Sequence, residues 1–109
     1  MERMTTAAAL AALAGDEGAR YKALFGHGSL EVGVYRPPGI DPQQPHTRDE
    51  LYVVIAGRGQ FVNGDTRRPF EPGEVLFVAA GVEHRFEDFT PDFAAWVFFY
   101  GPAGGECPA

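Results

Sequence analysis

Short runs of alternating apolar and polar residues, separated by glycine and proline, dominate the chain after its first twenty residues. Between Leu30 and Tyr35, the side chains of Leu30, Val32 and Val34 fall on one face, the pattern of a half-buried strand. Comparable runs predict further strands at 21–25, 51–56, 60–62, 67–70, 74–78, 83–86 and 93–100. Counting an irregular stretch at 39–45, the chain therefore predicts roughly eight or nine short strands joined by turns such as Asn63-Gly64-Asp65.

The order of these strands predicts the fold class. The sequence shows no crossover helix between successive strands, so strands that follow one another should pair antiparallel. A set of this size curls into a small antiparallel β-barrel or a two-sheet jelly roll. We therefore expect an all-β domain with three parts: an N-terminal helical segment at 1–20, a barrel at 21–101 and a loose C-terminal tail at 102–109.

The first fifteen residues differ from the rest of the chain. Arg3 precedes an alanine-rich run from Ala7 to Ala14, which faintly resembles a signal peptide, but Glu2 and the weakly apolar run argue against one. The alternative is a short helix that begins at Thr5 or Thr6 and stops at Gly15. We favour the helix, and with it a cytoplasmic protein without a membrane span.

The net charge and the cysteine content exclude some classes of binding partner and of metal site. The chain carries 15 acidic and 9 basic residues, for a net charge of −6, so its surface should repel nucleic acid. Cys107 is the single cysteine, which excludes an intrachain disulfide and a CxxC zinc site. His27 lies between two glycines, where a turn should expose it to solvent.

The remaining two histidines lie near carboxylate and amide side chains at suggestive spacings. Even spacing places Gln44, His46, Glu50 and Tyr52 on one face of an extended segment. His84 begins a separate short strand, and in a closed barrel it would face the same interior. Two imidazoles and one carboxylate suit non-haem Fe(II), and equally Zn, Ni, Mn or Co. By themselves, these residues are compatible with either a metal site or buried structural histidines.

Two segments of the chain resemble the two sequence motifs of the cupin superfamily. The stretch from Gly39 to Gly57, GIDPQQPHTRDELYVVIAG, resembles the first motif, in which six residues separate Glu50 from Gly57. The stretch from Gly73 to Asp88, GEVLFVAAGVEHRFED, resembles the second. Both occur in the expected order, about fifteen residues apart, so the chain is identified as a small single-domain cupin.

The resemblance implies a metal centre with ligands at His46, Glu50 and His84. Gln44 stands where the family usually has its first histidine, which leaves Gln44 open as a fourth ligand or as a neighbouring donor. An amide oxygen binds late transition metals less well than imidazole does. Two further departures, Ala79 for proline and Asp88 for asparagine, concern the geometry of turns and strand ends.

Several functions are consistent with such a centre. A metalloenzyme would activate dioxygen or act as a Lewis acid on a chelating, oxygen-rich small molecule, with Tyr52 handling protons. A non-catalytic module would bind or store a ligand or assist a pathway, and a sugar isomerase or epimerase is a third option. Tyr52, Phe86, Trp96 and Phe98 are candidates for the pocket wall, although small barrels more often use such side chains to fill the core. The small size and the aromatic last strand favour a homodimer.

Overall fold

A computed structural model describes residues 3–107. Within that range the chain forms one helix and eight strands, in the order α1 (Thr6–Ala14), β1 (Tyr21–His27), β2 (Leu30–Tyr35), β3 (Asp49–Ala56), β4 (Gly59–Asn63), β5 (Thr66–Phe70), β6 (Val75–Val78), β7 (His84–Glu87) and β8 (Ala94–Tyr100). Each predicted strand is present, with boundaries within a few residues of those expected. The stretch at 39–45 is not a strand but part of a long loop between β2 and β3.

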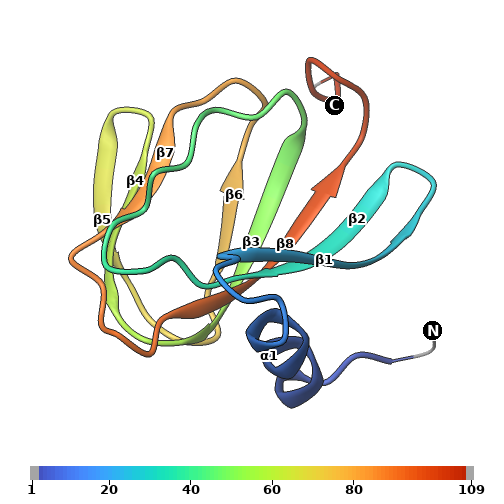
Figure 1. The fold of residues 1–109 in the computed structure, drawn as a ribbon. Helices are drawn as coiled ribbons and strands as arrows, with labels where there is room; N and C mark the ends of the chain where they lie inside the picture. Colours follow the sequence, from blue (N-terminus) through green and yellow to red (C-terminus); the bar gives the residue numbers. More distant parts are fainter. Residues whose placement is uncertain (1–2, 108–109) are drawn as a thin grey trace.

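The strands form two sheets (Figure 1). One has five strands in the order β1-β2-β8-β3-β6, and the other has three in the order β5-β4-β7. All paired strands run antiparallel, as predicted. The loop at 36–48 leaves β2, passes the three-stranded sheet and returns to β3 (Figure 1). This route brings residues of the loop to the end of the barrel where β3 begins.

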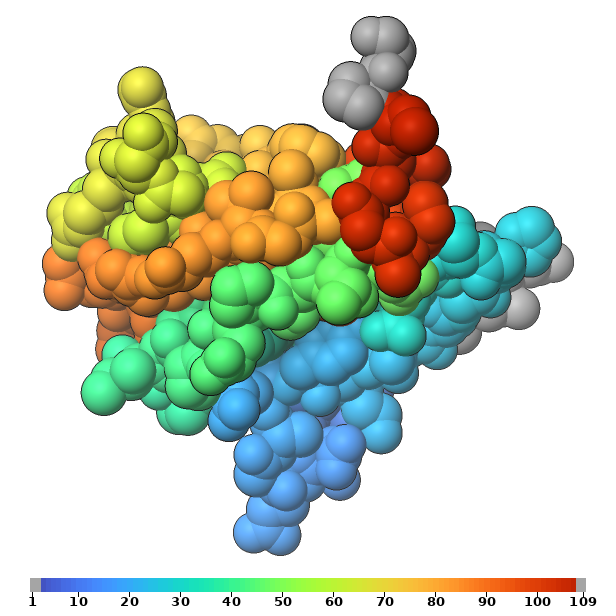
Figure 2. All heavy atoms as spheres, turned by 90° about the horizontal axis from the view of Figure 1, so that it is seen from above, coloured from blue at the N-terminus to red at the C-terminus, as the bar shows by residue number. Residues whose placement is uncertain are grey.

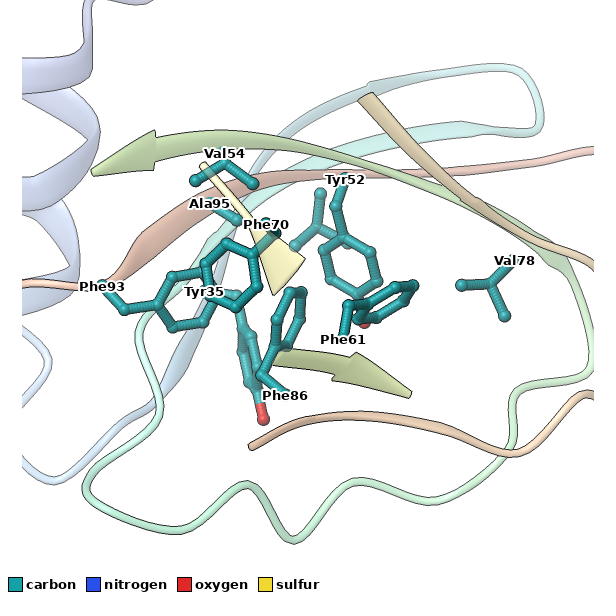
Figure 3. Packing of buried hydrophobic residues seen from close by; sticks show 10 residues of the cluster. Tyr35, Tyr52, Val54, Phe61, Phe70, Val78, Phe86, Phe93 and Ala95 are labelled. Atoms are coloured by element: carbon teal, nitrogen blue, oxygen red, sulfur yellow. The ribbon is translucent and has the colours of Figure 1, made fainter. Parts of the chain in front are cut away.

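Aromatic side chains from both sheets fill the space between them (Figure 3). Phe86 lies at the centre, with its ring centroid 4.5 Å from that of Phe93, 4.8 Å from Phe61 and 4.9 Å from Tyr52. These rings meet edge-on or tilted, the arrangement that aromatic quadrupoles favour. The aromatic core occupies most of the interior, so the open space for a ligand lies toward one end of the barrel.

The helix packs against the outer face of the five-stranded sheet. Thr5 caps it as predicted, since its hydroxyl accepts a hydrogen bond from the backbone N–H of Ala8 at 3.1 Å. Ala9 and Leu13 are buried against Val34, and Trp96 packs on the same cluster. This small second core attaches α1 to the sheet, on the face that lies away from the aromatic core. The structure contains no helix within residues 3–107 that is long and apolar enough to cross a membrane.

Alternation along β8 corrects one expectation about the pocket. Trp96 and Phe98 point to the outer face, because Trp96 packs in the helix cluster and Phe98 shares its parity on the strand. Val97 and Phe99 point inward instead. The predicted pocket-wall roles of Trp96 and Phe98 are therefore wrong, and Phe99 is the β8 aromatic that faces the interior.

The segment after β8, predicted as a loose tail, returns to the loop that precedes β3 (Figure 2). The N–H of Gly104 donates to the Thr47 carbonyl at 2.6 Å, and the N–H of Glu106 donates to Asp49 Oδ2 at 2.9 Å. The other Asp49 oxygen accepts from the N–H of Ala80 at 2.9 Å. Asp49 is buried and joins three segments.

Two positions of the cupin-like pattern have a backbone reason for their residue type. Gly57 has a φ of 91°, and a Cβ there would lie 2.5 Å from the Cα of Phe93. Asp88 has a φ of 51° and is the one non-glycine with positive φ among the described residues. Asparagine and aspartate adopt this conformation more readily than other side chains. The aspartate at position 88 therefore preserves the strand-end geometry.

Candidate metal centre

Glu50 is the buried carboxylate of the site. It is the second residue of β3 and pairs with Phe99 of β8 on one side and Val78 of β6 on the other. Its side chain is only 2% exposed. A carboxylate this deeply buried is costly unless a cation or hydrogen-bond donors compensate it. The site must therefore provide such compensation.

His84 meets Glu50 from the opposite sheet. Gly81, with a φ of 80°, turns the chain just before β7, and His84 is the first residue of that strand. Its Nδ1 lies 2.9 Å from the carbonyl oxygen of Val82, an acceptor, so Nδ1 carries the proton. The Nε2 atom then presents a lone pair to Glu50 Oε1 at 3.0 Å.

Glu50 Oε1 and His84 Nε2 face one another and can bind one cation between them. Both Glu50 Oε1 and His84 Nε2 are fully buried, and neither has a hydrogen bond of acceptable geometry within the described residues. Two facing lone pairs repel one another unless a proton or a metal ion lies between them. Burial lowers the pKa of His84, but the contacts with Glu50 and Val82 outweigh that effect and raise it overall. The pair is built to hold a positive charge.

His46 completes the group from the loop before β3. Its Nε2 lies 3.8 Å from Glu50 Oε1, and its ring centroid is 5.2 Å from that of His84. The ring stands edge-on to Phe99 at 5.0 Å, and the backbone oxygen of His46 accepts from the N–H of Gly81 at 2.7 Å. Burial lowers the pKa of His46. A neutral imidazole is the form that binds metal.

The three side chains together fit a divalent transition metal. One ligand atom from each of His46, Glu50 and His84 lies within 4.8 Å of the other two. Two imidazole nitrogens and one carboxylate oxygen form the donor set of facial sites with open coordination positions. His46 is 36% exposed at its side chain, whereas the other two are nearly fully buried. A metal held by these residues would be accessible from the His46 side.

Tyr52 is held beside the cluster by a buried hydrogen-bond network. Its hydroxyl donates to Gln43 Oε1 at 2.7 Å, and Gln43 Nε2 donates to Asp41 Oδ2 at 2.6 Å. Asp41 also accepts from the Tyr35 hydroxyl and from the N–H of Phe86, the latter at 2.8 Å. Burial and the Glu50 charge raise the pKa of Tyr52 far above its ordinary value. At neutral pH this tyrosine is a hydrogen-bond donor rather than a base.

A cavity of about 480 Å³ opens beside the cluster. This volume is typical of small-molecule sites. Its wall is formed by Arg20, Tyr21, Tyr35, Pro42, Gln43, Gln44, His46, Glu50, Tyr52, Val97 and Phe99. Gln44 lies on this wall but is exposed, and its predicted role as a fourth ligand stays a prediction.

Comparison with known proteins identifies the family. The sequence pattern described as "Cupin domain" matches residues 32–100, which is more than half of the chain. The chain belongs to the cupin family. The resemblance of its two motifs is thereby confirmed. This cupin is 34% identical over 76 residues to "Uncharacterized protein SCO3923" of Streptomyces coelicolor, a match that covers 68% of this chain and 72% of that protein.

Solved structures support the same fold. Protein NMB1881 from Neisseria meningitidis has a TM-score of 0.70 at 17% identity, covering 92% of this cupin and 100% of that chain. A cupin 2 conserved barrel domain protein from Salinispora arenicola has a TM-score of 0.60 at 21% identity, covering 74% of each chain. At these identities the likeness concerns the fold.

The structure brings together three of the four predicted ligands and places Tyr52 beside them. Sequence reasoning missed Asp41 and Gln43, which lie in a proline-rich stretch without periodicity. It also missed Arg20, which precedes β1 and lines the cavity from a distant part of the sequence. Only the three-dimensional course of the loop and of β1 relates these residues to the site.

Proposed function

We propose that this cupin holds one divalent transition metal at His46, Glu50 and His84 and binds a small oxygen-rich chelating molecule in the adjoining cavity. The observation that carries the proposal is the buried contact between Glu50 Oε1 and His84 Nε2 at 3.0 Å, without a proper hydrogen bond at either atom. A metal ion would satisfy both atoms at once.

The proposed chemistry is dioxygenase-like. When bound, the metal would supply open positions for a substrate and for dioxygen, or act as a Lewis acid on a chelated oxygen. The protein would contribute the rest: Phe99 and Val97 form an apolar part of the wall, and the Tyr52 hydroxyl, held in place by Gln43, is the group proposed to handle protons. The metal is one of Fe, Zn, Ni, Mn or Co, since all five accept this donor set.

Metal titration tests the proposal. Tag-free, metal-stripped protein should take up about one equivalent of zinc, nickel, manganese or Fe(II) per chain, measured by calorimetry and by elemental analysis. Glu50→Gln removes the only anionic ligand and should abolish uptake, whereas Glu17→Gln, on an exposed turn residue, should leave it intact. Absence of binding by every metal would refute the proposal.

A second candidate is a non-catalytic cupin that binds a small molecule, or a sugar isomerase or epimerase acting in the same cavity. The deep burial of Tyr52 and its bond to Gln43 favour ligand positioning over rapid proton exchange. Oxygen consumption that depends on an added chelating substrate separates the candidates. Oxygen uptake supports the dioxygenase, and binding without turnover supports the alternative.

We also propose that the chain forms a homodimer through the outer face of the five-stranded sheet. Leu51 and Val53 of β3 lie beside Phe77 and Val75 of β6 on that face, and Phe98 of β8 adjoins Leu51. Val75 is 62% exposed and Phe77 is 48% exposed. A continuous apolar surface of this kind is typical of a protein interface.

A further inference from the structure

We infer that the cavity selects an anionic ligand, a chelating molecule whose carboxylate pairs with Arg20 while its other oxygens face the His46–Glu50–His84 cluster. The inference rests on the proposed metal centre. It adds that the ligand is negatively charged and that Arg20 binds the charged group. Arg20 is the one cationic side chain on the cavity wall among the described residues.

The position of Arg20 is fixed by its backbone. Its carbonyl oxygen accepts a hydrogen bond from the N–H of Arg36 at 2.8 Å, and the next residue, Tyr21, pairs with Tyr35 as β1 begins. Burial raises the pKa of the Tyr35 hydroxyl, and the Arg20 charge opposes that rise. Arg20 and Tyr35 both lie on the cavity wall.

Arg20 has no ion-pair partner among the described residues. Apart from Glu50 of the proposed metal centre, the acidic groups around the cavity are already engaged. Glu31 accepts from the Tyr21 hydroxyl at 2.7 Å, and Asp41 accepts from Tyr35, Gln43 and the N–H of Phe86. An arginine without an ion-pair partner beside a cavity has free N–H donors for a ligand. The two oxygens of a carboxylate can accept hydrogen bonds from two of these donors at once.

The net charge of the proposed metal centre also favours an anionic ligand. Two neutral imidazoles and Glu50 leave a divalent cation with one uncompensated positive charge, and Arg20 adds a second at the same cavity. The carboxylate of an anionic ligand would pair with Arg20 while its chelating oxygens face the metal charge, whereas a neutral sugar brings no charge to either. Apolar side chains form part of the wall, among them Val97 and Phe99. The ligand should therefore have a short apolar or aromatic body between two polar ends.

A matched pair of probes tests this inference. The acid 3,4-dihydroxybenzoate carries a catechol for chelation and a carboxylate across the ring, and its methyl ester keeps the catechol but lacks the negative charge. Calorimetry on zinc-loaded protein should give binding of the acid about tenfold or more tighter than binding of the ester, as expected for one charge-assisted pair.

Substitutions at Arg20 test whether this residue causes the preference for the acid over the ester. Arg20→Gln should remove the difference between acid and ester, and Arg20→Lys should restore part of it. The control is Arg36→Gln, because Arg36 is an exposed arginine joined to Arg20 through the backbone, yet its side chain lines a different hollow with Pro37 and Phe89. This control should keep the full preference. Thermal melting of each variant reports whether it folds.

The outcomes separate the two proposals. Zinc content is measured first: protein that retains no zinc overturns the metal centre and this inference together. If zinc is retained, equal binding of acid and ester, binding of neither, or a preference that survives in Arg20→Gln overturns the role of Arg20 alone. Loss of the preference in Arg20→Gln, with zinc content unchanged, supports the inference.

Discussion

At the scale of single residues, Gln44 is the departure from the cupin pattern that concerns metal binding. Its side chain lies on the cavity wall, two residues before His46. Gln44→His would add an imidazole, a better donor than an amide for late first-row metals. We expect about a tenfold gain in zinc or nickel affinity, or about 1.4 kcal/mol, and a higher Tm with excess metal.

Glu50→Gln is the control for the metal titration of Gln44→His. If Gln44→His leaves affinity and Tm unchanged while Glu50→Gln abolishes binding, Gln44 lies outside the ligand set. If both substitutions leave binding unchanged, the metal assignment of the whole cluster is contradicted, and the barrel is better described as a metal-independent ligand-binding module.

The histidines predict how metal and protons compete. Contacts with Glu50 and Val82 raise the pKa of His84, so the metal-free protein gains stability from this contact below the ordinary histidine pKa. That gain is lost as pH rises through the raised pKa. Metal binding has the opposite sign, because it requires neutral imidazoles. The rise in Tm caused by zinc should therefore grow between about pH 5.5 and 7.5, which differential scanning fluorimetry measures directly.

At the scale of elements, the loop at 36–48 depends on Asp41. This buried carboxylate connects the loop to Tyr35 of β2 and to the N–H of Phe86 in β7. Asp41→Ala leaves those donors buried without an acceptor, at a cost of about 2–3 kcal/mol in the free energy of unfolding. Urea unfolding measures the loss. The exposed control Glu17→Ala should change the unfolding free energy by less than about 0.5 kcal/mol.

The elements also define what the sequence alone could predict. Strand positions followed from alternation and turn residues, and they are confirmed. The inward face of β8 did not follow, because Trp96 and Phe98 are as apolar as Val97 and Phe99. His46, Glu50 and His84 were found because their spacing resembles a family motif. Asp41 was not, since its partners come from β2 and β7.

At the scale of the whole molecule, the outer sheet face predicts the oligomeric state. Light scattering at tens of micromolar should give the mass of a dimer. Phe77→Lys places a charge in the proposed interface and should yield a monomer. Ile40→Lys is the matched control, since Ile40 is 78% exposed on the loop at 36–48, away from that face, and the dimer should persist. A wild-type monomer would contradict the proposal.

The three segments that carry His46, Glu50 and His84 differ in how they are held by hydrogen bonds of the sheets. This difference should affect the rate at which each segment opens. Glu50 belongs to a strand paired on both sides, by β8 and β6, whereas His46 lies in a loop without sheet pairing. Amide hydrogens of the strand should exchange with deuterium only through global unfolding, and those of the loop through local opening. Glu50 and His84 would then capture an incoming ion first and His46 would close on it last. Zinc should slow deuterium uptake in peptides covering 36–48 and leave β3 almost unchanged.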